Sequence, residues 1–173
     1  TPETLKMLQE GAIDFGVIST PIQRRMDFKF RKVRDIQDIF VAGKKFEYLA
    51  ERQLSYKDLE TLPVMCLEGN TSTRAYVEGF LRENGVHLQP EFELATSDML
   101  IRFAMRGFGI AGVAEDFALE AMEKGEIFRL HFDREIPKRH FCIVTDEKVP
   151  MTAAARRFLN LLEDKCTHDK HKT

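Results

Sequence analysis

The sequence predicts an α/β fold, because helical and strand-like segments alternate along nearly the whole chain. Stretches with apolar residues three and four positions apart, typical of helices with one buried face, alternate with short apolar runs typical of buried strands. Gly11, Pro63 and Gly85 separate these segments. The repeated alternation favours a parallel sheet flanked by helices.

The first helix begins at Thr1, which caps it, with Pro2 at the first helical position, and it ends at Gly11. A short helix follows much later, capped by Ser55, continuing through Leu59 and broken at Pro63. The buried runs of this half of the chain predict strands at residues 14–18, 28–33, 38–42 and 64–67.

In the second half, Thr71 or Ser72 caps a helix that ends at Gly85, and its inward-facing residues are Tyr76, Val77, Phe80 and Leu81. Ser97 is the predicted cap of the next helix, which Gly107 ends. Two further helices are predicted at residues 117–124 and after Thr152, and strands at 92–94, 109–113, 127–130 and 140–145.

Three glycines form the pattern G-x-G-x-x-G at Gly107, Gly109 and Gly112. A dinucleotide-binding loop needs these glycines after a strand and at the start of a helix. Here they follow a helix and lead into a strand, so the sequence predicts a helix stop and close strand packing, and no nucleotide site.

Composition limits the possible functions. The chain has 173 residues, 43% of them apolar and 31% charged, and a formal net charge of −2. These values predict a sizeable core in one domain or two small lobes, with no basic surface for nucleic acid and no membrane span. Cys66, Cys142 and Cys166 are few and widely spaced, which favours buried free thiols in a reducing compartment.

Five motifs resemble the ligand-binding domain of LysR-type transcriptional regulators, in that family's order. The first is L-x-x-G-x-I-D followed by hydrophobic residues, from Leu8 to Ile18. The others are residues 54–63, Thr96-Ser97-Asp98 with the glycine segment 107–111, residues 136–139, and Arg157-Phe158-Leu159. The resemblance extends from residue 1 to about residue 163.

The resemblance implies a type 2 periplasmic-binding-protein fold, with two α/β lobes joined by two crossing strands around a ligand cleft. Mapped onto this sequence, lobe I holds residues 1–62 and 138–173, lobe II holds residues 63–137, and the crossings fall near Pro63 and Arg139. The family's domain has a strand and a helix before the position of Thr1, preceded by a linker helix and a winged helix-turn-helix. We therefore expect residues 1–173 alone to fold poorly.

Short hydroxylated side chains at the starts of helices and the ends of strands are the candidate effector-binding residues. Hydroxyls and the N–H groups of a helix N-terminus suit a carboxylate or another small anion. Such residues also cap helices with no ligand present, and the resemblance is what favours a ligand role. The candidates are Thr1, Ser19, Thr71, Ser72, Thr73 and Ser97.

No catalytic motif, cofactor-binding motif or structural-metal motif is found in the sequence. Cys166, His168 and His171 have the chemistry of metal ligands, but a charged tail without supporting residues does not predict a site. We therefore expect no enzyme, cofactor or metal.

The resemblance implies a cytoplasmic effector-sensing domain of a LysR-type bacterial regulator. The protein would act as a homodimer or homotetramer and bind DNA only through a domain that these residues do not contain. A solute-binding protein of a transport system with the same fold is the alternative, and an enzyme on this fold is a second. An export signal would indicate the first, and a cluster of acid, base and nucleophile in the cleft would indicate the second.

Overall fold

The computed structural model describes residues 2–21 and 28–168, which form two compact units. Unit 1 comprises Thr1–Asp35 and Arg139–Thr173, and unit 2 comprises Ile36–Lys138. The lobes expected from the sequence were divided after residues 62 and 137. Residues 36–62 and Lys138 fall in unit 2, and the strand at 38–43 pairs with two of that unit's strands.

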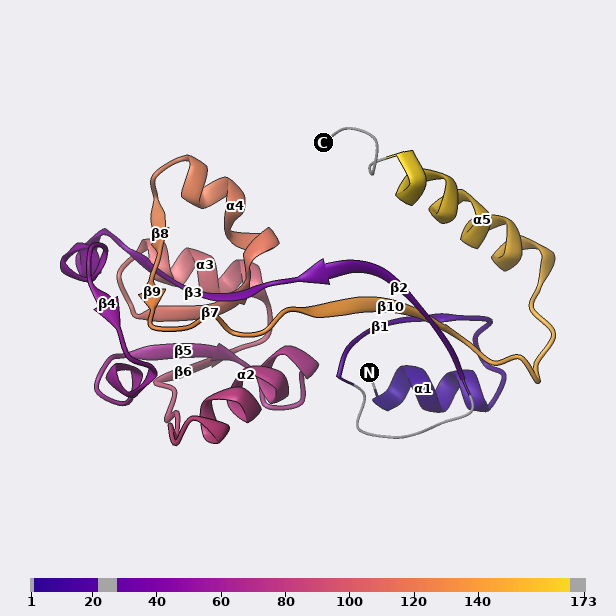
Figure 1. Ribbon diagram of the computed structural model, residues 1–173, viewed down its shortest axis with the longest axis horizontal. Coiled ribbons are helices and arrows are strands. Elements are labelled where there is room, and N and C mark those ends of the chain that lie inside the picture. The colour runs from indigo at the N-terminus through magenta and orange to yellow at the C-terminus, as the bar shows by residue number, and fades with distance from the viewer. Residues whose placement is uncertain (1, 22–27, 169–173) are drawn as a thin grey trace. The chain divides into compact units, whose positions relative to one another are not determined.

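The centre of unit 2 is a five-stranded sheet in the order β6-β5-β7-β3-β8 (Figure 1). β5 pairs in parallel with β6 and β7, whereas β3 runs antiparallel to both β7 and β8. The expected parallel sheet is therefore wrong in one strand. Among the described residues, no strand–helix–strand crossover joins β3 to β7 or β8, because β2 of the other sheet precedes β3 and η1 and β4 follow it. The bounds are β3 Asp38–Gly43, β5 Val64–Leu67, β6 Phe92–Leu94, β7 Ile110–Ala114 and β8 Ile127–Arg129.

Helices cover both faces of this sheet. All six residues of β3 are buried, and alternate residues enter different cores: Phe40 packs in one, Ile39 in the other. α2 (Ser72–Glu83) contributes Val77 and Leu81 to the core around Phe40. α3 (Ser97–Met105) and α4 (Glu115–Glu123) contribute to the core around Ile39. α2 therefore lies on one face, and α3 and α4 lie on the other (Figure 1).

The rest of unit 2 extends the face that carries α2. Two short 3₁₀ helices, η1 (Lys44–Leu49) and η2 (Tyr56–Glu60), flank β4 (Gln53–Leu54), which pairs in parallel with β9 (His131–Phe132). Ser55 caps η2 as predicted: its hydroxyl accepts from the Lys57 N–H, and Asp58 accepts from the Ser55 N–H at 2.7 Å.

Unit 1 has a three-stranded sheet in the order β1-β10-β2, with β1 and β10 antiparallel. Its core is small, and its buried members are Leu5, Leu8, Ile18, Cys142 and Val144. Thr152 precedes the last helix as predicted, since its hydroxyl accepts from the Ala155 N–H. The bounds are α1 Pro2–Gln9, β1 Gly16–Ser19, β2 Lys29–Ile36, β10 Arg139–Thr145 and α5 Ala153–His168.

The three-glycine segment has the helix-to-strand order that the sequence predicts. Gly107 has a φ of +74° and follows α3, so it ends the helix in the left-handed region. A Cβ at Gly109 would lie 2.5 Å from the Pro63 carbonyl oxygen, and one at Gly112 would lie 3.1 Å from Phe40. These glycines therefore let β7 pack closely.

Gly43 and Gly79 give a matched pair of substitutions in unit 2. A Cβ at Gly43 would collide with the Ala104 carbonyl oxygen, so we expect Gly43→Ala to lower the free energy of unfolding by about 3 kcal/mol. Gly79 lies inside α2 with no atom within 4 Å of an added Cβ, and Gly79→Ala should raise the free energy of unfolding by roughly 0.5–1 kcal/mol. Urea unfolding measures both, and equal effects would contradict this packing.

Candidate functional site

The candidate site lies at the carboxyl ends of three neighbouring parallel strands. β5 leads into α2 on one face of the sheet, while its neighbours β6 and β7 lead into α3 and α4 on the other. Leu67 and Leu94, the last residues of β5 and β6, are paired in register, so both strands end at the same level. In open α/β sheets, ligands bind where adjacent strands send their connections to opposite faces.

The α2 N-terminus is fixed to this edge by the side chain of Thr71. Its hydroxyl accepts from the Arg74 N–H at 3.2 Å and donates to the Glu68 carbonyl at 3.0 Å. The Glu68 N–H in turn donates to the Leu94 carbonyl at the end of β6. Thr71 is therefore the N-cap, and Ser72 and Thr73 occupy the first turn, where helix N–H groups point toward the edge.

The α3 N-terminus lies at the same edge but is capped by a different residue from the predicted one. The Thr96 hydroxyl accepts from the Met99 N–H at 3.3 Å, and Ser97 is the first helical residue. The prediction that Ser97 caps α3 is wrong by one position. Two consecutive hydroxylated residues left the sequence ambiguous, and the extended backbone of Thr96 decides between them.

Arg74 is a buried charge that sequence analysis missed. It is 7% exposed, donates to the Leu67 carbonyl at 3.0 Å, and pairs with Glu78 at 2.7 Å and Glu93 at 3.2 Å. Burial opposes its charge, but the hydrogen bond with Glu78 and the neighbouring groups outweigh burial and raise the pKa of Arg74 above its usual value. Arg74 therefore ties the first turn of α2 to β5 and β6.

Four of the predicted site residues lie at this edge of the unit 2 sheet. Thr71, Ser72, Thr73 and Ser97 belong to the α2 and α3 N-termini of unit 2. Ser19 is buried at the end of β1 in unit 1, next to Thr20, which exchanges hydrogen bonds with the His140 backbone. Thr1 lies outside the described residues.

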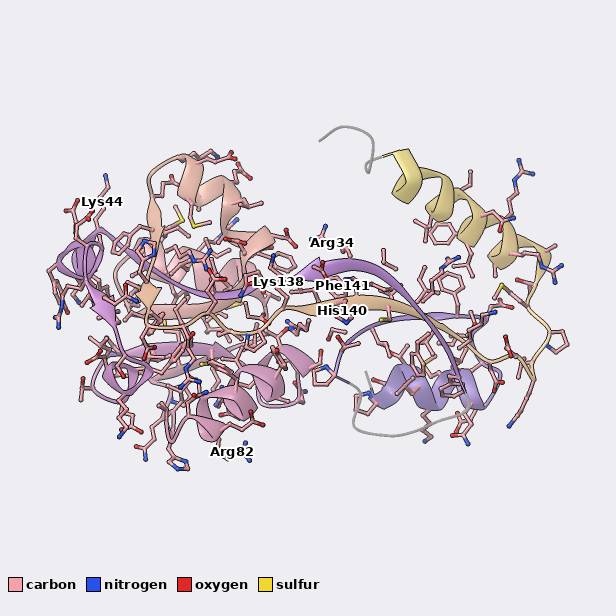
Figure 2. All side chains as sticks on the ribbon, viewed as in Figure 1. Arg34, Lys44, Arg82, Lys138, His140 and Phe141 are labelled. Carbon is pink, nitrogen blue, oxygen red and sulfur yellow. The ribbon has the colours of Figure 1, made fainter. Side chains whose placement is uncertain are left out.

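Residues 133–138, which we call the return segment, lead from unit 2 to unit 1 and are held by three hydroxyl or amide groups. Tyr56 donates to the Arg134 carbonyl at 2.9 Å, Gln37 to the Ile136 carbonyl at 2.8 Å, and Tyr76 to the Pro137 carbonyl at 2.7 Å. Lys138 ends the segment and is followed by β10, on which His140 and Phe141 lie (Figure 2).

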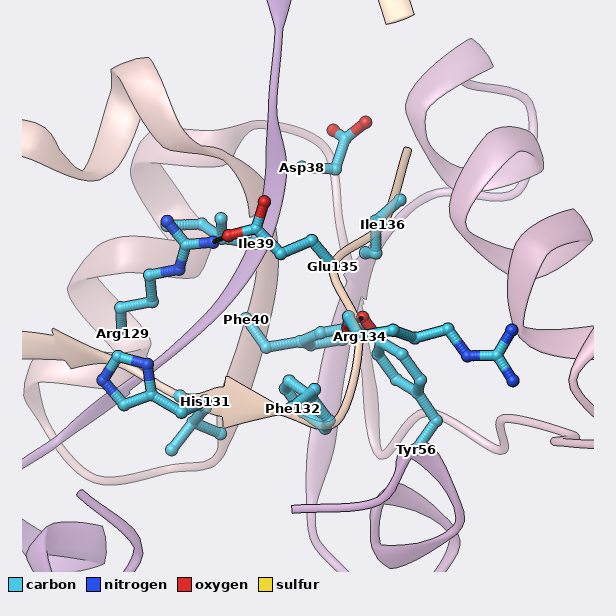
Figure 3. A pocket seen from close by; sticks show the side chains of 11 residues that line it. Asp38, Ile39, Phe40, Tyr56, Arg129, His131, Phe132, Arg134, Glu135 and Ile136 are labelled. Carbon is cyan, nitrogen blue, oxygen red and sulfur yellow. Dashed lines mark hydrogen bonds and ion pairs between the residues drawn. The ribbon is translucent and has the colours of Figure 1, made fainter. Parts of the chain in front are cut away.

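A separate pocket of about 210 Å³ lies beside the return segment in unit 2 (Figure 3). Its aromatic wall includes Tyr56 and Phe132, whose rings stack at 4.4 Å. On its polar side Arg129 pairs with Glu135 at 2.7 Å, and also with Glu115 at 2.9 Å. The pocket contains none of the predicted site residues.

The cysteines whose side chains are described are buried and free, as predicted. Cys66 lies in β5 and Cys142 in β10. Burial raises the pKa of the Cys66 thiol to about 11, so this thiol stays protonated near neutral pH. The side chains of Cys166, His168 and His171 lie outside the described residues, and no metal-ligand cluster occurs among those that are described.

The family model for the LysR substrate binding domain matches residues 1–167. The chain therefore belongs to the LysR substrate-binding-domain family, a family of regulatory domains and not of enzymes. A comparison with the curated proteins found no match.

Solved structures show the same fold. The regulatory domain of CcmR from Synechocystis PCC6803, in complex with 2-PG, is 16% identical with a TM-score of 0.80, over 92% of this chain and 76% of that one. The effector-binding domain of QuiR, in complex with shikimate, is 10% identical with a TM-score of 0.80, over 99% and 79%. HinK, a LysR family transcriptional regulator from Pseudomonas aeruginosa, is 15% identical with a TM-score of 0.73.

The match to HinK includes 96% of this chain but only 57% of the HinK chain. The expected α/β fold of the LysR effector-binding domains, related to type 2 periplasmic-binding proteins, is thereby confirmed. Among the described residues no helix is long and apolar enough to cross a membrane.

Tyr56 provides a test of the packing beside the return segment. Burial, followed by the charges of Asp133 and Glu135, raises the pKa of Tyr56 to about 12. Because the pKa of Tyr56 is raised in the folded protein, burying the neutral phenol stabilises the fold. This stabilisation is complete below the ordinary pKa of 10.0 and is lost as the pH rises through about 12. The phenolate absorbance of the wild type minus that of Tyr56→Phe should have its midpoint near pH 12. A midpoint near pH 10 in folded protein would contradict the burial.

Proposed function

We propose that the chain senses a small organic anion, bound at the edge of the unit 2 sheet where α2 and α3 begin. Thr71, Ser72 and Thr73 are the central residues of this proposed site, and Ser97 belongs to its second helix. Thr1 and Ser19 stay predictions, as does the inter-lobe cleft that the family resemblance implies.

The divergence of the connections after β5 and β6 is the observation that carries the proposal. α2 lies on one face of the sheet and α3 on the other, and the strands that lead into them, β5 and β6, end at paired residues. The positive ends of two helix dipoles therefore converge on one region, and the N–H groups of their first turns lie beside short hydroxyls. This combination suits a carboxylate or phosphate oxygen.

The charges around the edge favour a ligand with a modest negative charge. Arg74 is already paired with Glu78 and Glu93, so the anion would be held mainly by N–H groups and hydroxyls. Glu68 after β5 and Asp98 in the first turn of α3 are exposed carboxylates, and they would oppose a highly charged ligand. A small organic anion fits this balance better than a polyphosphate does.

The ligands of similar proteins agree with this class. CcmR was solved in complex with 2-PG and QuiR in complex with shikimate, and both compounds are small organic anions. For this chain, the ligand class is a proposal supported by family membership and by the two helix N-termini.

The proposed role in the cell follows from the family. We expect ligand binding to shift the population of conformations of a dimer or tetramer in the cytoplasm, and thereby to change how the regulator acts at DNA. DNA contact is assigned to a helix-turn-helix domain that these 173 residues do not contain.

A triple substitution tests the site. Thr71→Ala, Ser72→Ala and Thr73→Ala together should weaken ligand binding about tenfold or more, because hydrogen bonds of roughly 1 kcal/mol each are lost. A panel of small carboxylates, including shikimate and 2-PG, would first be screened by thermal shift, where ligand at a hundred times its Kd adds about 2.7 kcal/mol. Calorimetry then compares the wild type with the variant.

Ser55→Ala is the matched control for this experiment. It removes a hydroxyl cap from η2 in the same unit and should cost a similar capping energy, on the order of 1 kcal/mol, without changing affinity. Unchanged affinity in the triple variant, or equal losses in both, would show that the ligand is not held at the α2 N-terminus.

A second test concerns nucleic acid. The chain has a net charge of −2, with both signs mixed along its length, so it should not retain promoter DNA at physiological salt. A gel-shift assay over a series of salt concentrations measures this. Micromolar binding that weakens steeply with salt would contradict the assignment of DNA contact to another domain.

A further inference from the structure

α2 carries the proposed ligand residues at its start and a contact to the return segment one turn later. Tyr76 follows Ser72 by four residues, which places both on neighbouring turns of the same side of the helix. The Tyr76 hydroxyl donates to the Pro137 carbonyl at 2.7 Å, while its ring packs against the core beneath α2. One rigid helix therefore connects the proposed site with the return segment.

The other groups that hold the return segment come from elements without ligand residues. Tyr56 belongs to η2, and its ring is 5% exposed and stacked on Phe132. Gln37 lies between β2 and β3, and Arg129 ends β8. These contacts fix the segment to the body of unit 2, whereas Tyr76 alone among them joins it to the helix whose first turn would meet the ligand.

We propose that Tyr76 is a coupling residue, which transmits the state of the α2 N-terminus to the return segment through its hydrogen bond to Pro137. This regulatory role rests on the proposed function, since a ligand on the first turn of α2 is the natural input. When the first turn is ordered by a bound anion, α2 and Tyr76 are held in place and the Pro137 carbonyl is restrained. When that turn frays, the restraint weakens.

The return segment lies at the end of unit 2, directly before the strand where the chain enters unit 1. Lys138 is the last residue of unit 2, and Arg139, which is 3% exposed, begins β10 of unit 1. A restraint on Pro137 thus acts two residues before the chain enters the next unit's sheet. Tyr76 is a positioning residue in this scheme and needs no contact with the ligand.

A double-mutant cycle without ligand tests the coupling directly. Thr71→Ala frays the first turn of α2, and Tyr76→Phe removes the hydroxyl but keeps the ring. Amide hydrogen exchange of residues 133–136 and 138 is measured in the wild type, both single variants and the double variant, with urea unfolding as the measure of global stability. We expect Thr71→Ala to speed the exchange of these amides about fivefold when Tyr76 keeps its hydroxyl. In the Tyr76→Phe background the same substitution should have little effect.

Tyr56→Phe is the matched control, because it removes a hydrogen bond to the same segment from an element outside α2. Thr71→Ala should keep its full effect in that background. Thr71→Gly, a milder loss of the cap, replaces Thr71→Ala if the double variant unfolds. An effect of the cap substitution that is absent, or equal with and without the Tyr76 hydroxyl, would overturn the proposal. Because no ligand enters this cycle, its failure is distinct from failure of the binding test.

Discussion

The position of β5 between two parallel neighbours is the constraint on which the proposed site depends. β5 pairs with β6 on one side and with β7 on the other, and all four residues of β5 are buried. A parallel neighbour requires a crossover helix, and right-handed crossovers toward opposite sides must use opposite faces of the sheet. The separation of α2 from α3, and therefore the edge where both begin, follows from this strand order.

Close packing makes that strand order possible. β7 approaches β5 through Gly109, where a side chain would meet the Pro63 carbonyl, and approaches β3 through Gly112, where a side chain would press on Phe40. The same glycines resemble a nucleotide-binding pattern in the sequence. Their function here is set by the space around them, since the pattern lacks the strand-to-helix order that binding requires.

Local sequence predicted the elements well because caps and stops act within a few residues. Ser55 with Asp58 and Gly85 after α2 act as the pattern indicates. Pairing partners were less predictable. The apolar run of β3 shows that the strand is buried on both faces, but an apolar run does not encode which strands lie beside it. The predicted boundary consequently places β3 in lobe I while its pairing places it in unit 2, and its antiparallel direction was missed.

The candidate site divides in the same way. Thr71, Ser72 and Thr73 were placed correctly at a helix start, because hydroxylated residues at such a start are a local signal. Arg74 and Tyr76 were not, since the contacts that tie them to other elements lie far along the chain: Glu93 on β6 for Arg74, which also pairs with Glu78 one turn away, and Pro137 for Tyr76. Long-range hydrogen bonds of this kind depend on the completed fold and leave no periodic trace in the sequence.

These two residues would give α2 the two roles that we propose for it, ligand binding and coupling to the return segment. Arg74 anchors the first turn of α2 to the ends of β5 and β6, so the turn that would meet a ligand is positioned by the sheet. Tyr76, on the next turn, reaches the return segment. The start of α2 is therefore supported by the sheet through Arg74, and the next turn contacts the return segment through Tyr76. Such an arrangement allows a small binding energy to act on one defined part of the chain.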